Sequence, residues 1–271
     1  MSEAEQIARV ERPATVASLT ADLAALGVAP GMTVLVHSSL SALGWVSGGA
    51  QAVVLALRAA VGSAGTLVMP THSTGLTDPA DWQNPPVPES WWPIIRATMP
   101  AYDPATTPTR GMGAIPDCFR GAADVRRSDH PQDSFAAWGR DAAFITERHE
   151  LTSGLGEGSP LARLYERGGS VLLLGVGHGN NTSLHLAEAR ATFPGKRLGR
   201  TGAPIMVDGE RRWIAFDTLD VDAEDFPQLG TDFARDTGLV RAGPVAAAPA
   251  LLMPQWALVD YSKDWMERHR R

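Results

Sequence analysis

Cysteine is almost absent from this sequence of 271 residues: Cys118 stands alone, which excludes a disulfide framework and a structural zinc site built on cysteines. Long apolar runs are missing too, since stretches such as Val171–Leu174 are far shorter than the roughly 20 residues of a membrane span. Positive charge is in short supply, with 24 Lys and Arg against 30 Asp and Glu. No basic stripe interleaved with aromatic residues occurs, so we expect neither nucleic acid nor a membrane as a partner.

The beginning of the chain, residues 1–12, is charged and has no apolar signal core, so we expect a cytoplasmic protein. The sequence does contain 44% apolar residues, and a chain of this length buries a sizeable core without a covalent or metal staple. No repeat, low-complexity tract or flexible linker divides it. We therefore predict one domain, residues 1–271, acting as a monomer or homodimer.

Helical and extended patterns alternate near the start of the chain. Thr15–Leu26 has apolar residues at helical spacing and stops at Gly27, and Thr33–His37 indicates a buried strand. Gln51–Ala60 repeats the helical pattern and Thr66–Met69 the extended one. This alternation predicts a layered α/β core. Further elements are predicted at Asp141–Arg148, from Ser159-Pro160 to Gly168, and at Val171–Leu174, Thr182–Ala191, Arg212–Phe216, Asp222–Asp236 and Gln255–Arg270.

A loop insertion rich in proline and tryptophan is predicted at about residues 75–108. Its prolines are too dense for long helices or central strands. A loop of this length is usually a lid or a binding wall, and the alternative is a packed insertion whose tryptophans belong to the core.

The chain after Val171–Leu174 carries the most informative chemical pattern. A glycine turn there lets the backbone approach a ligand, and Thr182, His185 and Glu188 then lie three apart on one helix face. A histidine beside a carboxylate is the basic unit of a general base, although a structural histidine is the alternative. The pair Gly175-x-Gly177 matches a dinucleotide fingerprint only in part, and no His-Glu-x-x-His pattern favours metal.

Two further turns carry polar groups. His37-Ser38-Ser39-Leu40-Ser41 ends the first strand with hydroxyls and backbone N–H groups that suit an anionic or carbonyl-bearing ligand; a serine-rich structural turn is the alternative. No Gly-x-Ser-x-Gly elbow marks a serine nucleophile at this turn. The arginines near Arg110-Gly-Met-Gly113 and at 126–127 suit phosphate, or form surface ion pairs. Cys118 is not favoured as a covalent nucleophile.

Five motifs follow one another in a fixed order: His37-Ser38-Ser39-Leu40, Arg110-Gly-Met-Gly-Ala-Ile-Pro116, Arg127-Ser-Asp-His130-Pro-x-x-Ser134-Phe-Ala-Ala-x-Gly139, Ser159-Pro-Leu161, and Leu174-Gly-Val-Gly-x-x-x-Asn181-Thr182-Ser-Leu-His185-x-Ala-Glu188. Together they resemble the aminoglycoside 3-N-acetyltransferase family from about Leu23 to about Ala242.

The resemblance implies a single-domain, layered mixed α/β fold of the antibiotic acetyltransferase type, unlike the common small N-acetyltransferase fold. It implies acetyl transfer from acetyl-CoA, without a metal, to the 3-amino group of 2-deoxystreptamine in aminoglycosides, and hence antibiotic resistance. We expect direct transfer in a ternary complex, in which positioning removes much of the entropic barrier.

Matched by position, the resemblance implies that His185 is the general base and that Thr182 helps to stabilise the oxyanion. Glu188 orients His185 or holds substrate amines, and Glu224 or Asp225 is the alternative carboxylate partner of His185. The residues implied to contact acetyl-CoA are His37, Ser38, Ser39, Leu40, Ser41, Arg110, Met112 and Gly113.

A polycationic acceptor requires carboxylates around its ammonium groups. Five acidic residues lie within the nine positions 217–225, and Asp78 and Asp81 lie in the insertion. A solvated acidic face is the alternative, since an exposed charge pair contributes only about 0–1 kcal/mol. The candidate substrate contacts are Asp81, Asp217, Asp222, Glu224 and Asp225.

Three rival functions remain at this stage. An enzyme of the same fold acetylates a different amine, for example in antibiotic biosynthesis. A metal-dependent amidohydrolase uses His37, His130, His178 and His185. A ligand-binding protein keeps the cleft and has no turnover.

Overall fold

The computed structural model describes residues 2–271, so Met1 of the predicted domain lies outside the described residues. The helices are α1 (Glu3–Ala8), α2 (Val16–Leu26), α3 (Gly49–Val61), α4 (Trp92–Thr98), α5 (Ala114–Arg120), α6 (Ala142–Thr146), α7 (Pro160–Glu166), α8 (Ser183–Arg190), α9 (Phe226–Thr237) and α10 (Gln255–His269). The strands are β1 (Thr33–Ser38), β2 (Thr66–Pro70), β3 (Arg126–Arg127), β4 (Phe135–Gly139), β5 (Ser170–Leu174), β6 (Leu198–Val207), β7 (Glu210–Leu219), β8 (Arg241–Val245) and β9 (Ala248–Pro254).

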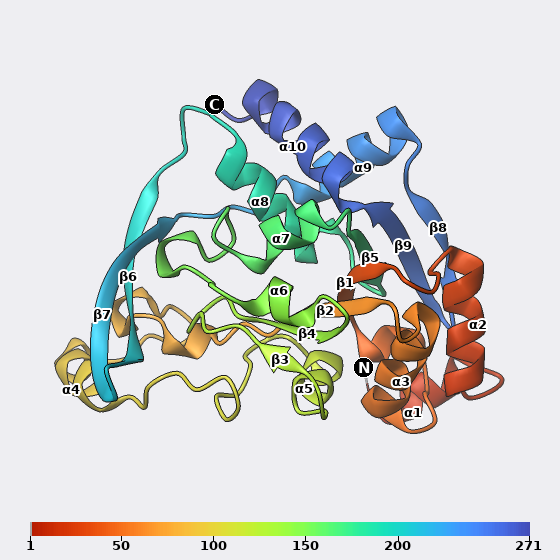
Figure 1. Ribbon diagram of the computed structural model, residues 1–271, viewed down its shortest axis with the longest axis horizontal. Helices are drawn as coiled ribbons and strands as arrows, with labels where there is room; N and C mark the ends of the chain where they lie inside the picture. Colours follow the sequence, from red (N-terminus) through yellow and green to blue (C-terminus); the bar gives the residue numbers. More distant parts are fainter. Residues whose placement is uncertain (1) are drawn as a thin grey trace.

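A seven-stranded mixed sheet forms the centre of the molecule, in the order β3-β4-β2-β1-β5-β9-β8 (Figure 1). Strand β1 runs parallel to β2 and β5, whereas β4, β9 and β8 pair antiparallel with their neighbours. The predicted α/β layering is therefore confirmed. Because β2, β1 and β5 are parallel, the loops that leave their carboxyl ends meet at one edge of the sheet, where ligands bind in open α/β folds.

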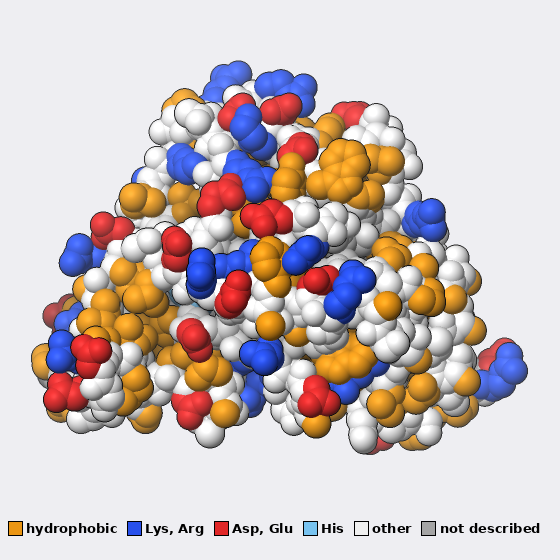
Figure 2. Space-filling view, in the orientation of Figure 1, with side chains coloured by type: hydrophobic (Ala, Val, Ile, Leu, Met, Phe, Trp, Pro, Cys, Tyr) orange, Lys and Arg blue, Asp and Glu red, His pale blue; other side chains and the backbone are white. Residues whose placement is uncertain are grey.

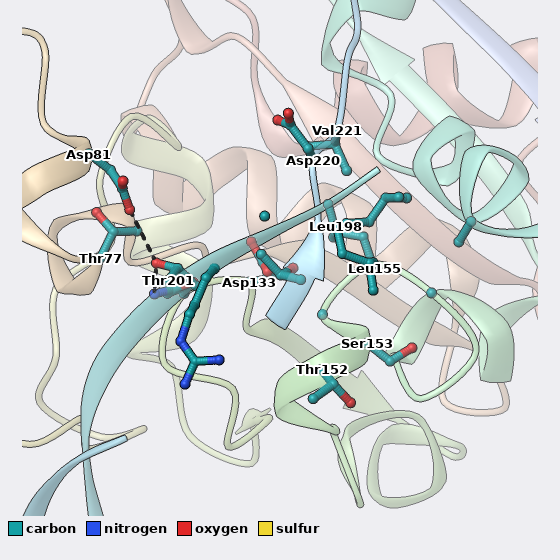
Figure 3. A pocket seen from close by; sticks show the side chains of 18 of the residues that line it. Thr77, Asp81, Asp133, Thr152, Ser153, Leu155, Leu198, Thr201, Asp220 and Val221 are labelled. Carbon is teal, nitrogen blue, oxygen red and sulfur yellow. Dashed lines mark hydrogen bonds between the residues drawn. The ribbon is translucent and has the colours of Figure 1, made fainter. Parts of the chain in front are cut away.

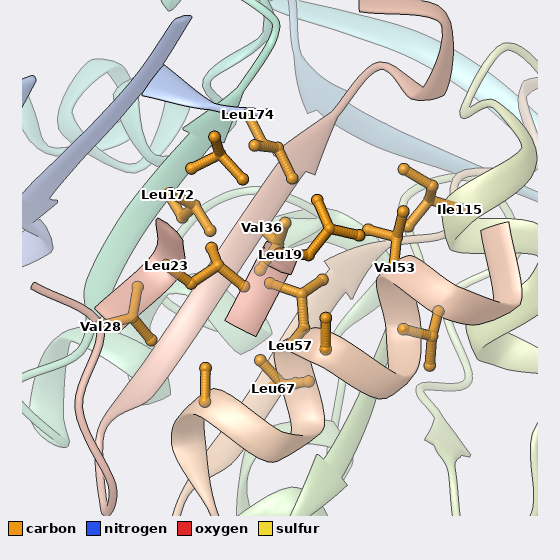
Figure 4. Close-up of a cluster of buried hydrophobic side chains, with 14 of the residues drawn as sticks. Leu19, Leu23, Val28, Val36, Val53, Leu57, Leu67, Ile115, Leu172 and Leu174 are labelled. Atoms are coloured by element: carbon orange, nitrogen blue, oxygen red, sulfur yellow. The ribbon is translucent and has the colours of Figure 1, made fainter. Parts of the chain in front are cut away.

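Apolar side chains alternate between the two faces of β1. Val34 and Val36 join a buried cluster with α2 and α3 (Figure 4), whereas Leu35 joins a second cluster with helices on the opposite face. Each fully buried residue of this kind stabilises the fold by roughly 1.5–3 kcal/mol relative to an exposed one. The two clusters hold the strands rigidly and so fix where their carboxyl ends point.

Helix boundaries largely follow the local signals. Thr15 caps α2 through Ser18, and Gly27 ends it in a left-handed conformation. Ser159 caps α7 with Pro160 at the first helical position, as predicted. Helix α8 runs from Ser183 to Arg190, one residue shorter at each end than predicted.

Other predicted elements are corrected. The helix expected at Asp141–Arg148 spans only Ala142–Thr146, because Arg148 has a positive φ of 52° that a right-handed helix cannot contain. The amphipathic stretch Asp222–Asp236 becomes helical only at Phe226. Strands β4, β8 and β9, and the hairpin arm β6, were not predicted from the sequence.

The insertion at 75–108 contains short 3₁₀ turns and α4, and no strand. It meets the tip of the hairpin β6–β7, which arches along one side of the molecule (Figure 1). Arg211 donates a hydrogen bond to the carbonyl of Met99 (3.0 Å), and the backbone N–H of Tyr102 donates to Pro204 (2.9 Å). Insertion and hairpin thus form one continuous wall beside the sheet edge.

On the face shown in Figure 2, acidic and basic side chains are intermingled over the centre, with no broad patch of one sign. Within residues 2–271, no helix has the length and apolar character needed to cross a membrane.

Candidate active site

Three histidines lie at the carboxyl edge of the parallel strands. His37 is the penultimate residue of β1, His72 follows β2, and His185 is in α8, which begins after the glycine turn that leaves β5. His37 contacts Thr182, the residue just before α8, with 3.3 Å between its Nε2 and the threonine hydroxyl, and His185 follows in that helix. The fold therefore brings the candidate base to the same region as the 37–41 turn.

His37 is a neutral, buried imidazole. Burial chiefly, and then the charges of His72 and His185, lowers the pKa of His37 to about 3. Its Nε2 lies 3.3 Å from the hydroxyl oxygen of Thr182. That hydroxyl does not cap α8, because the side chain of Asn181 accepts the hydrogen bond from the Ser183 N–H instead (3.2 Å). Thr182 thus links the start of α8 to the end of β1.

His185 and Glu188 form a hydrogen-bonded pair one helical turn apart. The Nδ1 of His185 lies 2.8 Å from the Oε2 of Glu188. The side chain of Glu188 is 1% exposed and that of His185 is 13% exposed. Since a carboxylate oxygen accepts hydrogen bonds, the Nδ1–H of His185 is the donor of this bond, which leaves Nε2 as the ring nitrogen that faces away from Glu188. The ring also packs on Phe226, with centroids 4.8 Å apart.

The other oxygen of Glu188 has partners of its own. Its Oε1 accepts hydrogen bonds from the backbone N–H of Asp222 (3.0 Å) and from the guanidinium of Arg270. Asp225 pairs with the same guanidinium (2.7 Å), and the backbone N–H of Glu224 donates to Asp222 (2.9 Å). Within residues 2–271, therefore, Glu188 is the carboxylate bonded to His185, and neither Glu224 nor Asp225 is.

The 37–41 turn contains an unpaired polar group. The hydroxyl of Ser38 is buried without a hydrogen-bond partner among the described residues, and those of Ser39 and Ser41 lie 3.3 Å apart. Leu40 starts a 3₁₀ turn. Gly175, with φ of 72°, lets the turn after β5 pass this segment, because a side chain there would collide with Ala42.

The second predicted cofactor segment reaches the same edge through its backbone. The N–H of Arg110 donates to the carbonyl of His72 (2.9 Å), which fixes the start of Arg110–Gly113 beside the end of β2. Arg110 and Gly113 are exposed and Met112 is half-buried.

A hollow of about 590 Å³ opens between β6–β7, the insertion and the loops at 132–133 and 152–156 (Figure 3). Asp81 lines it and accepts a hydrogen bond from Thr201 (3.4 Å). Burial, and then Asp78, raises the pKa of Asp81. Asp133 and Asp220 also line this hollow, which gives it three carboxylates.

A second hollow, of about 560 Å³, adjoins the first, since Asp220 and Val221 line both. Asp222, Glu224 and Asp225 line the second hollow together with Arg270. Asp217 lines neither of the two; it forms an exposed ion pair with Arg200 on the hairpin (3.4 Å). The predicted acidic residues are thus divided among three environments.

His130, from the third motif, has both ring nitrogens occupied. Nδ1 accepts from the backbone N–H groups of Gln132 (3.2 Å) and Asp133 (2.8 Å), and Nε2 faces the carbonyl of Leu151 (3.2 Å). The ring of His149 stacks beside it at 4.6 Å. The pair therefore holds the loops that border the first hollow.

Three residues of this region were not predicted from the sequence: His72, Asp133 and Arg270. The position of His72 just after a predicted strand was a usable signal. Its side chain is 8% exposed and its Nε2 is buried without a partner among residues 2–271. Burial chiefly lowers the pKa of His72 to about 4. No cluster of three or more His, Cys, Asp or Glu side chains suited to a metal occurs in the described part of the chain.

These features define an α/β enzyme whose histidine–carboxylate pair lies on α8 at the carboxyl edge of the sheet, and Ala189 of the same helix lines the first hollow. The sequence pattern of the aminoglycoside 3-N-acetyltransferase family matches residues 35–267. The chain belongs to this family and is an aminoglycoside 3-N-acetyltransferase with a mixed α/β fold.

Individual relatives agree with this assignment. The SPbeta prophage-derived aminoglycoside N(3')-acetyltransferase-like protein YokD of Bacillus subtilis (strain 168) is 48% identical over 254 residues, 93% of this chain and 92% of that one. The crystal structure of YokD matches with a TM-score of 0.95 at 44% identity, over 98% of each chain. The structure of AAC-IIIb in a binary complex with CoASH matches with a TM-score of 0.85 at 34% identity, over 96% of this chain and 98% of that one. The structure of AAC-VIa bound to sisomicin matches with a TM-score of 0.84 at 32% identity, over 96% of this chain and 99% of that one.

Proposed function

We propose that this enzyme transfers the acetyl group of acetyl-CoA directly to the 3-amino group of the 2-deoxystreptamine ring of aminoglycosides, with His185 as general base, and that it thereby confers antibiotic resistance. The observation that carries the proposal is the hydrogen bond between His185 and Glu188, 2.8 Å long, at the edge where the 37–41 turn also lies. We also propose a cytoplasmic location and a monomeric or homodimeric state, as expected from the sequence. Light scattering measures the oligomeric state.

His185 handles the proton. An ammonium group has no lone pair for attack, so the acceptor must lose a proton before or during transfer. Glu188 holds the Nδ1–H of His185 and leaves the Nε2 lone pair free to take that proton. The nearly buried carboxylate also stabilises the imidazolium that results.

The residues of the 37–41 turn fit a ligand rich in amide and carbonyl groups. Acetyl-CoA supplies the acetyl group as an activated thioester. The unpaired Ser38 hydroxyl is a buried group that a bound ligand would satisfy, and Ser39 and Ser41 add two more hydroxyls. With a proton on Nε2, His37 donates to Thr182, whose hydroxyl is then free to donate to an acyl oxygen. The CoASH complex of AAC-IIIb supports acetyl-CoA as the acetyl donor.

The first hollow suits the cationic acceptor. Asp81, Asp133 and Asp220 line it, and a bound ammonium group would offset the charge of these carboxylates. The sisomicin complex of AAC-VIa supports an aminoglycoside as the acceptor. The carboxylate of Asp225, by contrast, already pairs with Arg270, and that of Asp222 accepts from the backbone N–H of Glu224, which favours Asp133 over them as a substrate contact.

The test is a thiol-release assay with acetyl-CoA and gentamicin, tobramycin or neomycin, with the acetylated position identified by NMR. We expect His185→Ala to lower kcat by at least about 100-fold with unchanged thermal unfolding, the scale of a lost general base. His269→Ala, at an exposed histidine in α10, is the matched control. Absence of CoA release with every aminoglycoside would refute the proposal, and release with another amine alone would favour the same chemistry on a different acceptor.

A further inference from the structure

The guanidinium of Arg270 connects the catalytic pair to the segment before α9. It donates to Glu188, binds both carboxylate oxygens of Asp225 (2.8 and 2.7 Å) and donates to the backbone carbonyl of Asp222 (2.7 Å). Its plane lies near the rings of Phe193 and Phe226, at 5.2 and 5.9 Å. Five groups from three segments therefore fix the position of one side chain that is 11% exposed.

Such an arrangement matters because Glu188 is buried. A carboxylate removed from water is strongly destabilised unless a cation and hydrogen-bond donors replace the lost solvation. Arg270 provides the cation, and its planar fork fixes the geometry in a way that a point charge does not. Burial alone would lower the pKa of Arg270, but the hydrogen bonds that its guanidinium donates to Asp225 and Glu188 outweigh burial and raise it, so the group is always charged.

We propose that Arg270 is a positioning residue for acetyl transfer: it holds one carboxylate oxygen of Glu188 so that the other faces His185. The inference rests on the proposed function for the role of His185 as base. The family pattern ends at residue 267, so Arg270 lies beyond the matched positions. A salt bridge that only stabilised the fold would not require the second carboxylate oxygen to face a histidine.

The charges around the pair determine the expected pH dependence. Glu188 contacts His185 on its own helix. It also contacts Asp222, in the segment before α9, and Arg270, which follows α10 and pairs with Asp225. Arg197, Asp220, Glu224 and Arg271 line the hollow beside them. Removing the guanidinium leaves the pair in a more negative field, which favours protonation of His185 and Glu188. The acidic limb of the kcat/KM profile then moves to higher pH.

The experiment compares Arg270→Gln, Arg270→Lys and the control Arg268→Ala, at an exposed arginine whose side chain donates to a carbonyl of its own helix. Two readouts are taken: the pH profile of kcat/KM, and the titration of the His185 ring nitrogens by NMR in the free enzyme. We expect Arg270→Gln to lower kcat at least tenfold and to move the acidic limb and the His185 titration upward by about one pH unit. Arg270→Lys keeps the charge, so it loses less activity and leaves the limb in place.

Equal behaviour of the Gln and Lys variants, or an unchanged His185 titration in a folded Arg270→Gln, would overturn the inference. The NMR readout needs no turnover, so it separates this outcome from failure of the proposed function, which shows as a wild-type enzyme without acetyl transfer. If Arg270→Gln does not fold, Asp225→Asn is the second variant, because it weakens the hold on Arg270. It should lower kcat about threefold or more with KM unchanged, and a raised KM with unchanged kcat would count against the proposal.

Discussion

The substitution Glu188→Gln tests how the carboxylate controls the proton on His185. In the native structure one carboxylate oxygen accepts from two donors, the Asp222 N–H and Arg270, while the other accepts from His185. An amide has one acceptor and one donor end. The two donors at Oε1 require the amide oxygen there, so the amide NH₂ faces Nδ1 of His185. Nδ1 must then accept, and the proton moves to Nε2, where it blocks the base.

The size of the effect follows from that reversal. A correctly placed base contributes typically 10²–10⁴-fold, and a carboxylate-to-amide change that imposes the wrong histidine tautomer costs the upper part of that range. We therefore expect kcat to fall about 10³-fold, or about 4 kcal/mol of transition-state stabilisation. KM for the aminoglycoside should change little, because Glu188 does not line the first hollow.

The assay is steady-state thiol release at saturating acetyl-CoA, with thermal unfolding measured alongside. Glu157→Gln is the control, since Glu157 pairs with Arg190 on the surface and is 63% exposed. A loss of less than about threefold in kcat for a folded Glu188→Gln would show that the carboxylate does not set the tautomer. An equal loss in the Glu157 variant would point to a general effect of the substitution.

Two further predictions concern pH and the acceptor. The pKa of His37 is lowered to about 3 and that of His72 to about 4, from 6.5, so the unfolded chain binds protons that the folded chain does not. The free energy of unfolding is therefore highest above about pH 6.5 and falls as the pH drops below that value, by up to about 1.4 kcal/mol per pH unit for each ring. Urea unfolding at several pH values between about 7 and 5 measures this dependence, and the free energy of unfolding of His72→Gln should fall less steeply with decreasing pH. Asp133→Asn should raise KM for the aminoglycoside about tenfold with kcat nearly unchanged, the scale of one charge-assisted hydrogen bond. Asp264→Asn, at an exposed position of α10, should change neither constant, and an unaltered KM for Asp133→Asn would remove Asp133 from the acceptor site.

The sequence predicts those elements whose signals are local. Thr33–His37 and Val171–Leu174 are uninterrupted apolar runs, and Ser159-Pro160 is a capping pair, so each is found within a residue or two. Strand β8, in contrast, contains Gly243 and Pro244, and its extended form depends on pairing with β9. Such pairing is a tertiary property that a window of neighbouring residues does not contain.

The candidate site likewise combines features that local sequence signals predict with features that depend on tertiary contacts. The spacing of Thr182, His185 and Glu188 placed the three on one helix, and two of them bond as expected for a histidine and a carboxylate. The acidic run at 217–225 predicts substrate contacts, a solvated acidic face or a carboxylate partner for His185, because charge can be counted in a sequence whereas the partners of each charge cannot. Asp225 in fact neutralises Arg270, a residue with no sequence signal of its own.

The wall formed by the hairpin β6–β7 and the insertion has a consequence for how the enzyme diversifies. Neither segment contributes a strand to the seven-stranded sheet, and the two are joined to each other through Arg211 and Tyr102. Thr201 of the hairpin and Asp81 of the insertion border the hollow proposed for the acceptor, while His185, the proposed base, lies on α8. Loop exchange or randomisation can therefore retune which amine is accepted while the machinery for transfer, and the packed layers beneath it, stay as they are.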